Sequence, residues 1–428
     1  MPRTNKMRKG CEWGWTQFAL ILLVSFLAGQ DQAAAGIGAP AAVIGPQRML
    51  IVAVRFPGTV PAFSLSQLKE KVGKVDGYLR AASYGKTWLE PKLVGWYEMP
   101  APLSQYQVSP LNYTVDRGRV RRLLADALAA ARKDSAIEEY HVVWIVVGAH
   151  TRPGEGYGMI AYCANPGMLS GVRSHRAALE TVELPGGLAF SGPAIVSAEN
   201  AHVGHVAHDL LHALGGTRDG RRVVPDLYDS DMQSNPEIFR NPPGGRLLPR
   251  IFAVHAGPWD IMSQHFIEFP KAPPAPSTFT RLQLGWIDPD QVVTVRPGET
   301  RELVLQPLAL GKGQLVVRIP LDSNRYLLLE NRQGVGGDTV LPSAGLLVLE
   351  VDTAREEGRG IVRAVNANPG IPYLYAAPFV PGAGERRYHR DPLIGVAVAP
   401  LAIEPGSALR LIITTPERVA EYVPVDRH

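Results

Sequence analysis

Cysteine is scarce in this sequence. Only Cys11 and Cys163 occur among its 428 residues, and Cys11 belongs to an N-terminal segment with the features of an export signal. The processed chain would therefore hold one cysteine, which excludes a disulfide-stapled framework. Cys163 lies in the turn-rich sequence GYGMIAYCANPG, where we expect a small, partly buried residue rather than a metal ligand or a reactive thiol.

Long apolar runs and basic stripes are also missing. Beyond the first 35 residues no segment has 18 consecutive apolar residues, so no membrane span is expected in the processed chain. Aromatic residues make up 7% of the sequence, and they are not interleaved with a stripe of Lys and Arg. These absences argue against a membrane partner and against a nucleic-acid partner.

The N-terminus carries the one long apolar run. A basic start is followed by FALILLVSFLAG at residues 18–29 and by three alanines at 33–35. The run is shorter than the roughly 20 residues that span a bilayer, and its flanks fit a signal-peptidase site. We therefore predict a signal peptide over residues 1–35 and a secreted or periplasmic mature protein.

The part of the chain before residue 295 mixes strands and helices. Apolar runs at 48–58 and 140–150 predict buried strands. Helical spacing of apolar residues predicts helices over 64–85 and 119–133, while 87–100 predicts alternating strand and turn. A further helix is expected from about residue 200 to 214, ended by two glycines, and a short one within TFTRLQLGW at 278–286.

After residue 295 the pattern changes. Short apolar runs separated by turn residues predict an all-β module; they are ELVLQPL, QLVVRIPL, RYLLLENRQ, GLLVLEVD, LIGVAVAPL and LRLIITT. The sequence therefore predicts an α+β protein with a mixed domain at 36–295 and a β-rich C-terminal domain at 296–428.

Two histidines in the helix HVAHDLLHALGG have the spacing of a metal site. His208 and His212 stand four residues apart, so one helix face presents both imidazoles. A zinc hydrolase needs such a pair, a third protein ligand and an open position for water. An isolated pair would more often lie on a surface, but the neighbouring Asp209 and the preceding buried strands favour a site. His205 shares the same face, so a site made of three histidines is an alternative.

Several motifs occur in the order typical of one enzyme family. They are HDLLHALG at 208–215, PDLYD at 225–229, GPWDIMS at 257–263 and TRLQLGWI at 280–287. The chain resembles the M6 family of secreted metalloproteases, the immune inhibitor A group, whose pattern is HExxHxLGLPDxYD followed by a WDxMS turn. The family also has segments similar to RMLIVAVRFPG, YLLLENRQ and LPSAGLLVLEVD. The resemblance therefore covers most of residues 48–400.

The resemblance implies a fold, a site and a reaction. It implies a metzincin-like catalytic domain in which His208, His212 and Asp226 hold Zn²⁺ and Met262 forms the turn beneath the metal. Asp209 would act as general base on a zinc-activated water that hydrolyses a peptide bond of a protein or peptide substrate. The resemblance also implies calcium binding, for which YDSD at 228–231 is the candidate.

The chain departs from the family pattern at three places. Asp209 replaces the family's Glu and is shorter by one methylene, although general-base geometry is demanding. A catalytically inactive relative that binds metal or a partner is therefore the alternative to an active peptidase. Glu350 stands where the family often has His, with no effect that we can assign.

The third departure is an insertion before the third ligand. The sequence TRDGRRVV at 217–224 lengthens the connection between His212 and Asp226. The insertion contains Asp219, which is an alternative to Asp226 as the third ligand. His205 is another alternative. The three arginines of the insertion, at 218, 221 and 222, are expected to be solvated loop residues near the mouth of the cleft.

Overall fold

The computed structural model describes residues 43–106, 116–149, 161–171, 176–230, 254–265, 267 and 271–423. The predicted signal peptide lies outside these residues. In the described part, no helix is both long and apolar enough to cross a membrane. Helices and several sheets occur together, as the predicted α+β class requires. All described residues belong to one compact unit.

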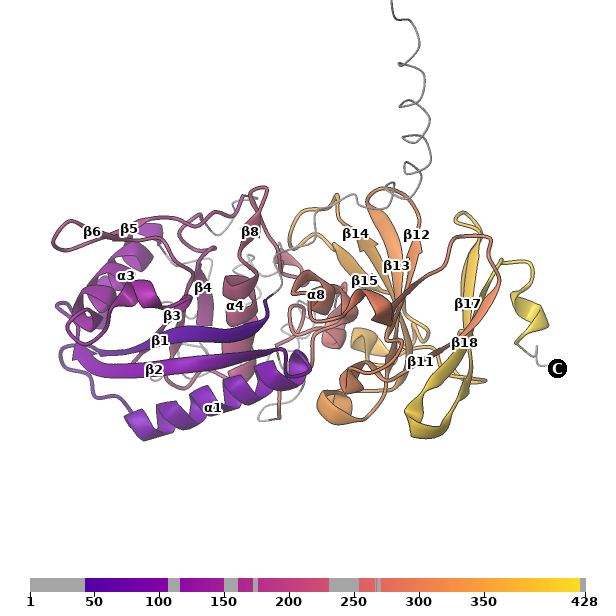
Figure 1. Ribbon diagram of the computed structural model, residues 1–428, viewed down its shortest axis with the longest axis horizontal. Helices are drawn as coiled ribbons and strands as arrows, with labels where there is room; N and C mark the ends of the chain where they lie inside the picture. Colours follow the sequence, from indigo (N-terminus) through magenta and orange to yellow (C-terminus); the bar gives the residue numbers. More distant parts are fainter. Residues whose placement is uncertain are drawn as a thin grey trace, which may run out of the picture. The chain divides into compact units, whose positions relative to one another are not determined.

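A five-stranded sheet forms the centre of the first part (Figure 1). Its order is β2 (Thr87–Glu98), β1 (Gly45–Arg55), β3 (Val142–Val147), β7 (Ala194–Ala198) and β4 (Ala161–Asn165). The strands from β2 to β7 pair in parallel, and β4 runs antiparallel to β7 at the edge. The apolar runs of β1 and β3 are explained by this position, because helices cover both faces of the sheet.

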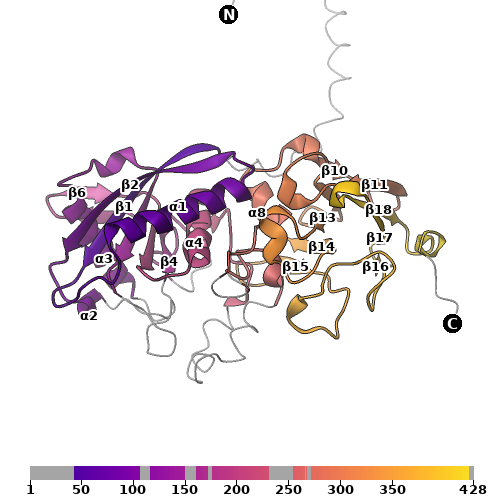
Figure 2. The same cartoon turned by 90° about the horizontal axis from the view of Figure 1, so that it is seen from below.

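Alternate residues of β1 point to opposite layers. Met49 and Ile51 pack with α1 (Leu65–Ala82) and α4 (Val203–Gly215), whereas Leu50 and Val52 pack with α3 (Arg117–Ala131). Figure 2 shows α1 and α4 beside each other. The sheet thus supports α4, the helix that carries the paired histidines, from one side. The remaining elements of this part are short: α2 (Leu103–Tyr106), β5 (Val182–Leu184), β6 (Leu188–Phe190), β8 (Thr217–Arg218), β9 (Arg221–Arg222) and α8 (Thr278–Gln283).

The prediction of alternating strand and turn at 87–100 is wrong. Residues 87–98 form a single twelve-residue strand, β2, rather than alternating strand and turn. Pro91 lies inside this strand and pairs with Met49. The proline is tolerated because β2 is the edge strand of the sheet, where one side of the backbone needs no ladder partner.

Two mainly antiparallel sheets follow, and all six apolar runs predicted after residue 295 contribute strands to them. The first has the order β10 (Val292–Thr294), β12 (Val316–Pro320), β13 (Arg325–Arg332), β14 (Gly345–Asp352), β15 (Val362–Ala364). The second has the order β11 (Arg301–Leu305), β18 (Leu409–Thr414), β17 (Val396–Ile403), β16 (His389–Asp391). Leu327 and Leu411 belong to the core that the two sheets share.

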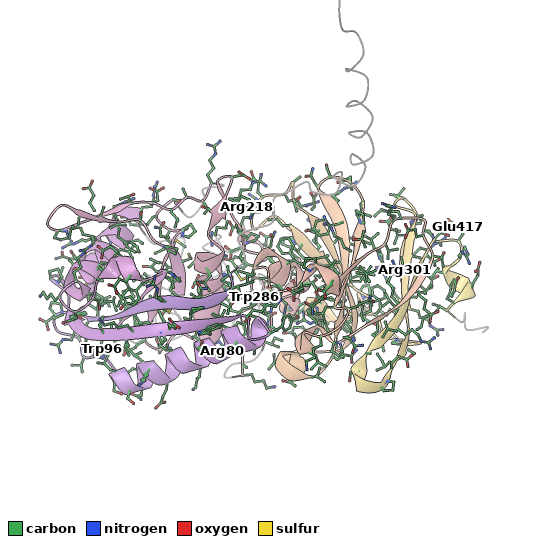
Figure 3. All side chains as sticks on the ribbon, in the orientation of Figure 1. Arg80, Trp96, Arg218, Trp286, Arg301 and Glu417 are labelled. Atoms are coloured by element: carbon green, nitrogen blue, oxygen red, sulfur yellow. The ribbon has the colours of Figure 1, made fainter. Side chains whose placement is uncertain are left out.

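The other face of the first antiparallel sheet joins the core around α4. Leu328 on β13 and Leu347 on β14 pack in the same apolar cluster as Leu211 of α4 and Trp259. Trp286, labelled in Figure 3, is buried, and its indole N–H lies 3.0 Å from Val43 O. The apolar core therefore continues from the parallel sheet to β13 and β14, across the change of pattern near residue 295.

Candidate metal centre

The helix α4 begins and ends where its sequence provides caps. His202 is the N-cap, and its Nδ1 accepts a hydrogen bond of 2.9 Å from the backbone N–H of Gly204. Gly216 closes the helix with φ of 64°, a conformation that favours glycine. Nearly every residue between is buried, because α1 and the parallel sheet lie on one side and the segment around Trp259 on another. His208 and His212 therefore face the interior.

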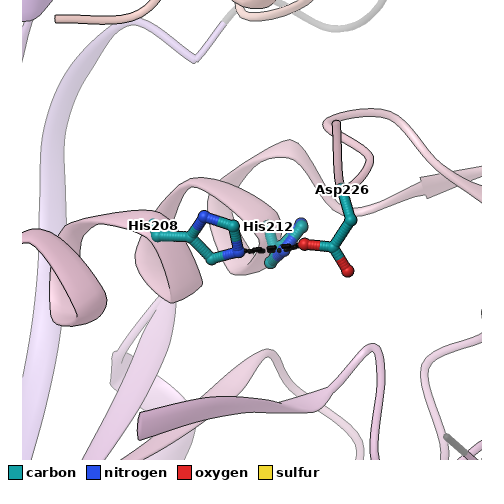
Figure 4. Close-up of side chains that lie close together, drawn as sticks. All are labelled: His208, His212 and Asp226. Carbon is teal, nitrogen blue, oxygen red and sulfur yellow. Dashed lines mark hydrogen bonds and ion pairs between the residues drawn. The ribbon is translucent and has the colours of Figure 1, made fainter. Parts of the chain in front are cut away.

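Three side chains converge beside this helix (Figure 4). The Nε2 atoms of His208 and His212 are 2.9 Å apart, and they lie 3.0 Å and 3.1 Å from Asp226 Oδ1. All three side chains are buried. His208 and His212 come from one face of α4, as their spacing predicts, and Asp226 comes from the turn at 225–229.

Each imidazole is oriented by its other nitrogen. His208 Nδ1 lies 3.1 Å from Ile261 O, and His212 Nδ1 lies 2.6 Å from Val224 O. A carbonyl can only accept, so each Nδ1 carries a proton, and in the neutral ring each Nε2 then has a free lone pair. This second set of contacts is the arrangement that fixes the tautomer of metal-bound histidines.

The three atoms fit one divalent ion. His208, His212 and Asp226 form a group that can hold a metal ion. Bonds of about 2.0–2.1 Å in a tetrahedron separate ligand atoms by about 3.3 Å, so a shift of a few tenths of an ångström opens the observed triangle to the required size. Two imidazoles and one carboxylate leave a fourth position for water.

The charges around the group favour a neutral His212 and an ionised Asp226, whereas burial of His208 is outweighed by the hydrogen bond and charge of Asp226, which raise the pKa of His208. Burial, and then the nearby Arg222, lower the pKa of His212 to about 3. Burial opposes ionisation of Asp226, but the histidines and Arg222 outweigh it and hold the pKa of Asp226 well below its usual range. A neutral imidazole and an ionised carboxylate are the forms that coordinate a metal.

The other candidates for third ligand lie outside the group. Asp219 is exposed in the turn between β8 and β9, with φ of 51°, and the Asp-Gly sequence suits such a tight hairpin turn. The ring of His205 packs against that of His265, with centroids 4.9 Å apart. The insertion thus folds into a short hairpin that returns the chain to α4, because Val223 N–H donates to Gly216 O over 3.0 Å.

The expectation for the inserted arginines is wrong for one of them. Arg218 lies in the hairpin (Figure 3), but the side chain of Arg222 is only 15% exposed. Its Nη1 lies 3.9 Å from Asp226 Oδ2, and its Nε lies 3.5 Å from Glu357 Oε1. Nothing in the sequence signals the contact with Glu357, because Glu357 lies 131 positions beyond Asp226.

Asp209 is buried next to the group but does not belong to it. Its carboxyl is buried, and burial raises its pKa to about 7. Cys163 is a small buried residue of β4, as expected, and its Sγ donates to Pro166 O over 3.2 Å. Burial raises the thiol pKa above its ordinary value, so this cysteine is poorly suited to act as a nucleophile.

The turn around Met262 touches both elements that carry ligands. Ile261 O contacts His208, while Met262 O accepts a hydrogen bond of 2.9 Å from Leu227 N–H. Asp260 is buried and accepts from Met262 N–H over 2.8 Å. The WDIMS segment therefore connects α4 to the turn that supplies Asp226.

Two further residues from the sequence are placed elsewhere. Glu350 lies on β14, paired with Leu327 of β13, and it is not part of the group. In the candidate calcium segment, Asp229 Oδ2 lies 3.9 Å from His255 Nε2, while Asp231 is outside the described residues. Calcium binding stays a prediction.

Searches with the whole chain find no matching family model and no similar curated protein. The geometry of the group is therefore the main support for any function.

Proposed function

We propose that this chain is a secreted zinc-dependent metalloendopeptidase of the M6 type, with a metzincin-like catalytic domain. The observation that carries the proposal is the convergence of His208, His212 and Asp226 with both histidines oriented by backbone carbonyls. Zinc is the ion that two imidazoles and one carboxylate favour in hydrolases. The predicted signal peptide at residues 1–35 supports a location outside the cytoplasm.

The roles of the residues follow from this site. His208, His212 and Asp226 would hold the zinc ion, which would supply Lewis acidity to polarise the scissile carbonyl and to lower the pKa of a water. Asp209 takes a proton from the attacking water and passes it to the leaving amine, which is general acid–base catalysis. The carbonyls of Ile261 and Val224 keep the imidazoles in place throughout.

Casein cleavage by residues 36–428 tests this proposal. We expect cleavage that a chelator abolishes and that added zinc restores. The variant His212→Ala should be inactive, while Asp219→Asn, a change in the exposed hairpin turn, should retain activity. Zinc binding without any cleavage by the wild-type chain would contradict the peptidase.

One observation favours a second candidate, a catalytically inactive protein that binds metal or a partner. The carboxylate of Asp209 is one methylene shorter than the family's Glu, and it is buried beside the group without belonging to it. The substitution Asp209→Glu separates the two candidates. A large gain of activity indicates a slow peptidase, whereas no activity in either protein indicates that the site binds metal without catalysis.

A further inference from the structure

A loop of the C-terminal part contacts the turn that carries Asp226. Residues 353–360 connect β14 to β15, and we call them the 353–360 loop. Glu357 Oε1 accepts a hydrogen bond of 2.8 Å from Asp226 N–H. The backbone of Gly358 adds two more bonds, donating to Asp226 O over 3.2 Å and accepting from Ser230 N–H over 3.3 Å. The loop therefore holds the backbone of Asp226 at both its N–H and its C=O.

The close approach depends on a glycine. Gly358 has φ of 70°, and a Cβ added there would lie 1.7 Å from Ser230 Oγ and 3.1 Å from Ser230 N. A side chain at this position would separate the loop from residues 225–230, and the left-handed backbone also disfavours one. The two backbones therefore contact each other directly, because residue 358 has no side chain to lie between them.

A buried arginine adds a charge interaction to this contact. Arg222, on strand β9 of the inserted hairpin, lies between two carboxylates, 3.5 Å from Glu357 and 3.9 Å from Asp226. The guanidinium balances the negative charge that Glu357 brings close to Asp226. Burial strengthens such charge interactions relative to water. The hairpin and the 353–360 loop therefore approach Asp226 from two separate parts of the sequence.

The connection from the helix leaves Asp226 in need of such support. Fourteen residues separate His212 from Asp226, and a longer connection constrains the position of its end less than a short one. Ligand geometry must nevertheless be accurate to within a fraction of an ångström for strong metal binding. The 353–360 loop supplies three backbone anchoring contacts to this turn, in addition to the bond from Leu227 N–H to Met262 O.

We propose that Glu357 is a positioning residue for the third metal ligand, so that the C-terminal β-rich part completes the metal centre through the 353–360 loop. The inference rests on the proposed metal site but not on peptidase activity. Outer partners of metal ligands typically contribute a factor of about 10–100 to metal affinity, and Glu357 should fall in this range.

Zinc affinity of matched variants tests the proposal. The affinity of residues 36–428 is measured by competition with a chromophoric chelator. We expect Glu357→Ala to weaken zinc binding about 10–100-fold. Glu357→Gln should weaken it less, by at least about threefold, because its amide oxygen still accepts from Asp226 N–H while the charge next to Arg222 is lost. The control is Glu356→Ala, which removes the same charge from the exposed neighbour and should leave the affinity within about twofold.

A spectroscopic measurement separates positioning from a loss of folding. The visible spectrum of the cobalt-substituted protein reports the geometry around the ion. At saturating cobalt, Glu357→Ala should give bands shifted or weakened relative to the wild type, while the metal-free variant retains its circular dichroism spectrum. If Glu357→Ala does not fold, the same two measurements on Glu357→Gln test the positioning role.

Three results would overturn the inference: unchanged zinc affinity in the folded Glu357 variants, an equal loss in Glu356→Ala, or a wild-type chain that binds no zinc. The proposed function fails differently. Wild-type zinc binding that depends on Glu357, without casein cleavage, would contradict the peptidase and support the positioning role.

Discussion

The two histidines of the candidate metal group differ from the other histidines nearby in the partners of their ring nitrogens. His208 and His212 each place Nδ1 against a main-chain carbonyl and Nε2 toward Asp226. His202 uses its Nδ1 to cap the helix instead, and His205 packs against His265. One face of a helix therefore carries histidines with different roles, and the spacing alone could not separate them.

The proposed role of Asp226 as the third ligand can be tested by replacing one of its carboxylate oxygens with an amide nitrogen. Asp226→Asn replaces a coordinating carboxylate by a neutral amide, which binds zinc poorly. We expect zinc affinity to fall by at least about 100-fold, beyond the range typical of outer partners. The matched change Asp219→Asn, in the exposed hairpin turn, should have no effect. An equal loss in both variants, measured by chelator competition, would argue against the observed geometry.

Among the elements near the group, the sequence pattern did not reveal where the 353–360 loop and the hairpin of β8 and β9 lie. Turn residues predicted a loop at each place, but the position of a loop in space depends on long-range contacts. Arg222 was expected in solvent because arginine in an inserted loop is usually solvated. Its partners, Asp226 and Glu357, are brought together only by the packing of β14 and β15 beside α4.

The fit of the 353–360 loop predicts a contrast between two glycines. Gly358→Ala introduces both a left-handed alanine and a clash with Ser230. Gly382 has φ of 66° with nothing within 4 Å of an added Cβ, so Gly382→Ala isolates the backbone cost of about 1–2 kcal/mol. We expect Gly358→Ala to have the lower melting temperature and the weaker zinc binding. Equal behaviour of the two variants would show that the loop has room to move.

Lys71 on helix α1 should make the stability of the chain depend on pH. Lys71 Nζ donates to Ala201 O over 2.8 Å and also to Glu199 O. Burial lowers the pKa of Lys71 to about 8 from an ordinary 10.5, against the opposing charge of Glu199 and together with Lys74. His202 also faces this ammonium. Between these two pH values the folded chain binds fewer protons than the unfolded chain, so this lysine makes stability rise with pH.

The measurement compares the wild type with Lys71→Met in urea. From pH 8 to 9.5 the stability of the wild type should rise relative to the variant by on the order of 1 kcal/mol. Lys74→Met, a change on the exposed neighbouring turn, should leave most of that slope in place. A wild-type curve parallel to that of Lys71→Met would contradict the lowered pKa.

For the molecule as a whole, a buried charge network joins the C-terminal sheets to the turn around Met262. Arg332, at the end of β13, donates to Asp338 over 2.7 Å and 2.8 Å, to Glu330 over 2.8 Å and to Trp259 O over 2.9 Å. Glu330 in turn accepts from Thr278 N–H over 2.7 Å. The residues of this network are buried.

Removal of this arginine should destabilise the whole chain. Arg332→Met leaves Glu330 and Asp338 buried without their partner, which costs about 3–5 kcal/mol for a buried pair. Arg301→Met, at the exposed start of β11, should change stability by less than about 0.5 kcal/mol. Urea midpoints measure both. A midpoint for Arg332→Met close to that of the control would show that water reaches the network.

Much of this architecture was predictable from sequence periodicity. Apolar runs gave strands β1 and β3 and six of the strands after residue 295, and helical spacing gave α1, α3 and α4. The long strand β2 was missed because Pro91 and Gly95 suggest turns, whereas an edge position tolerates them. The spacing of two histidines predicted that their side chains share one helix face, but the placement of Asp226 beside them required a resemblance to a family and then the folded structure.

The most direct test of the account is the zinc content of the purified chain. Residues 36–428, dialysed against excess zinc and then against metal-free buffer, should retain about one zinc per chain. The variants His212→Ala and Asp226→Ala should retain none under the same conditions, with circular dichroism spectra like that of the wild type. A wild-type chain without zinc, or variants that keep it, would contradict a metal centre made of His208, His212 and Asp226.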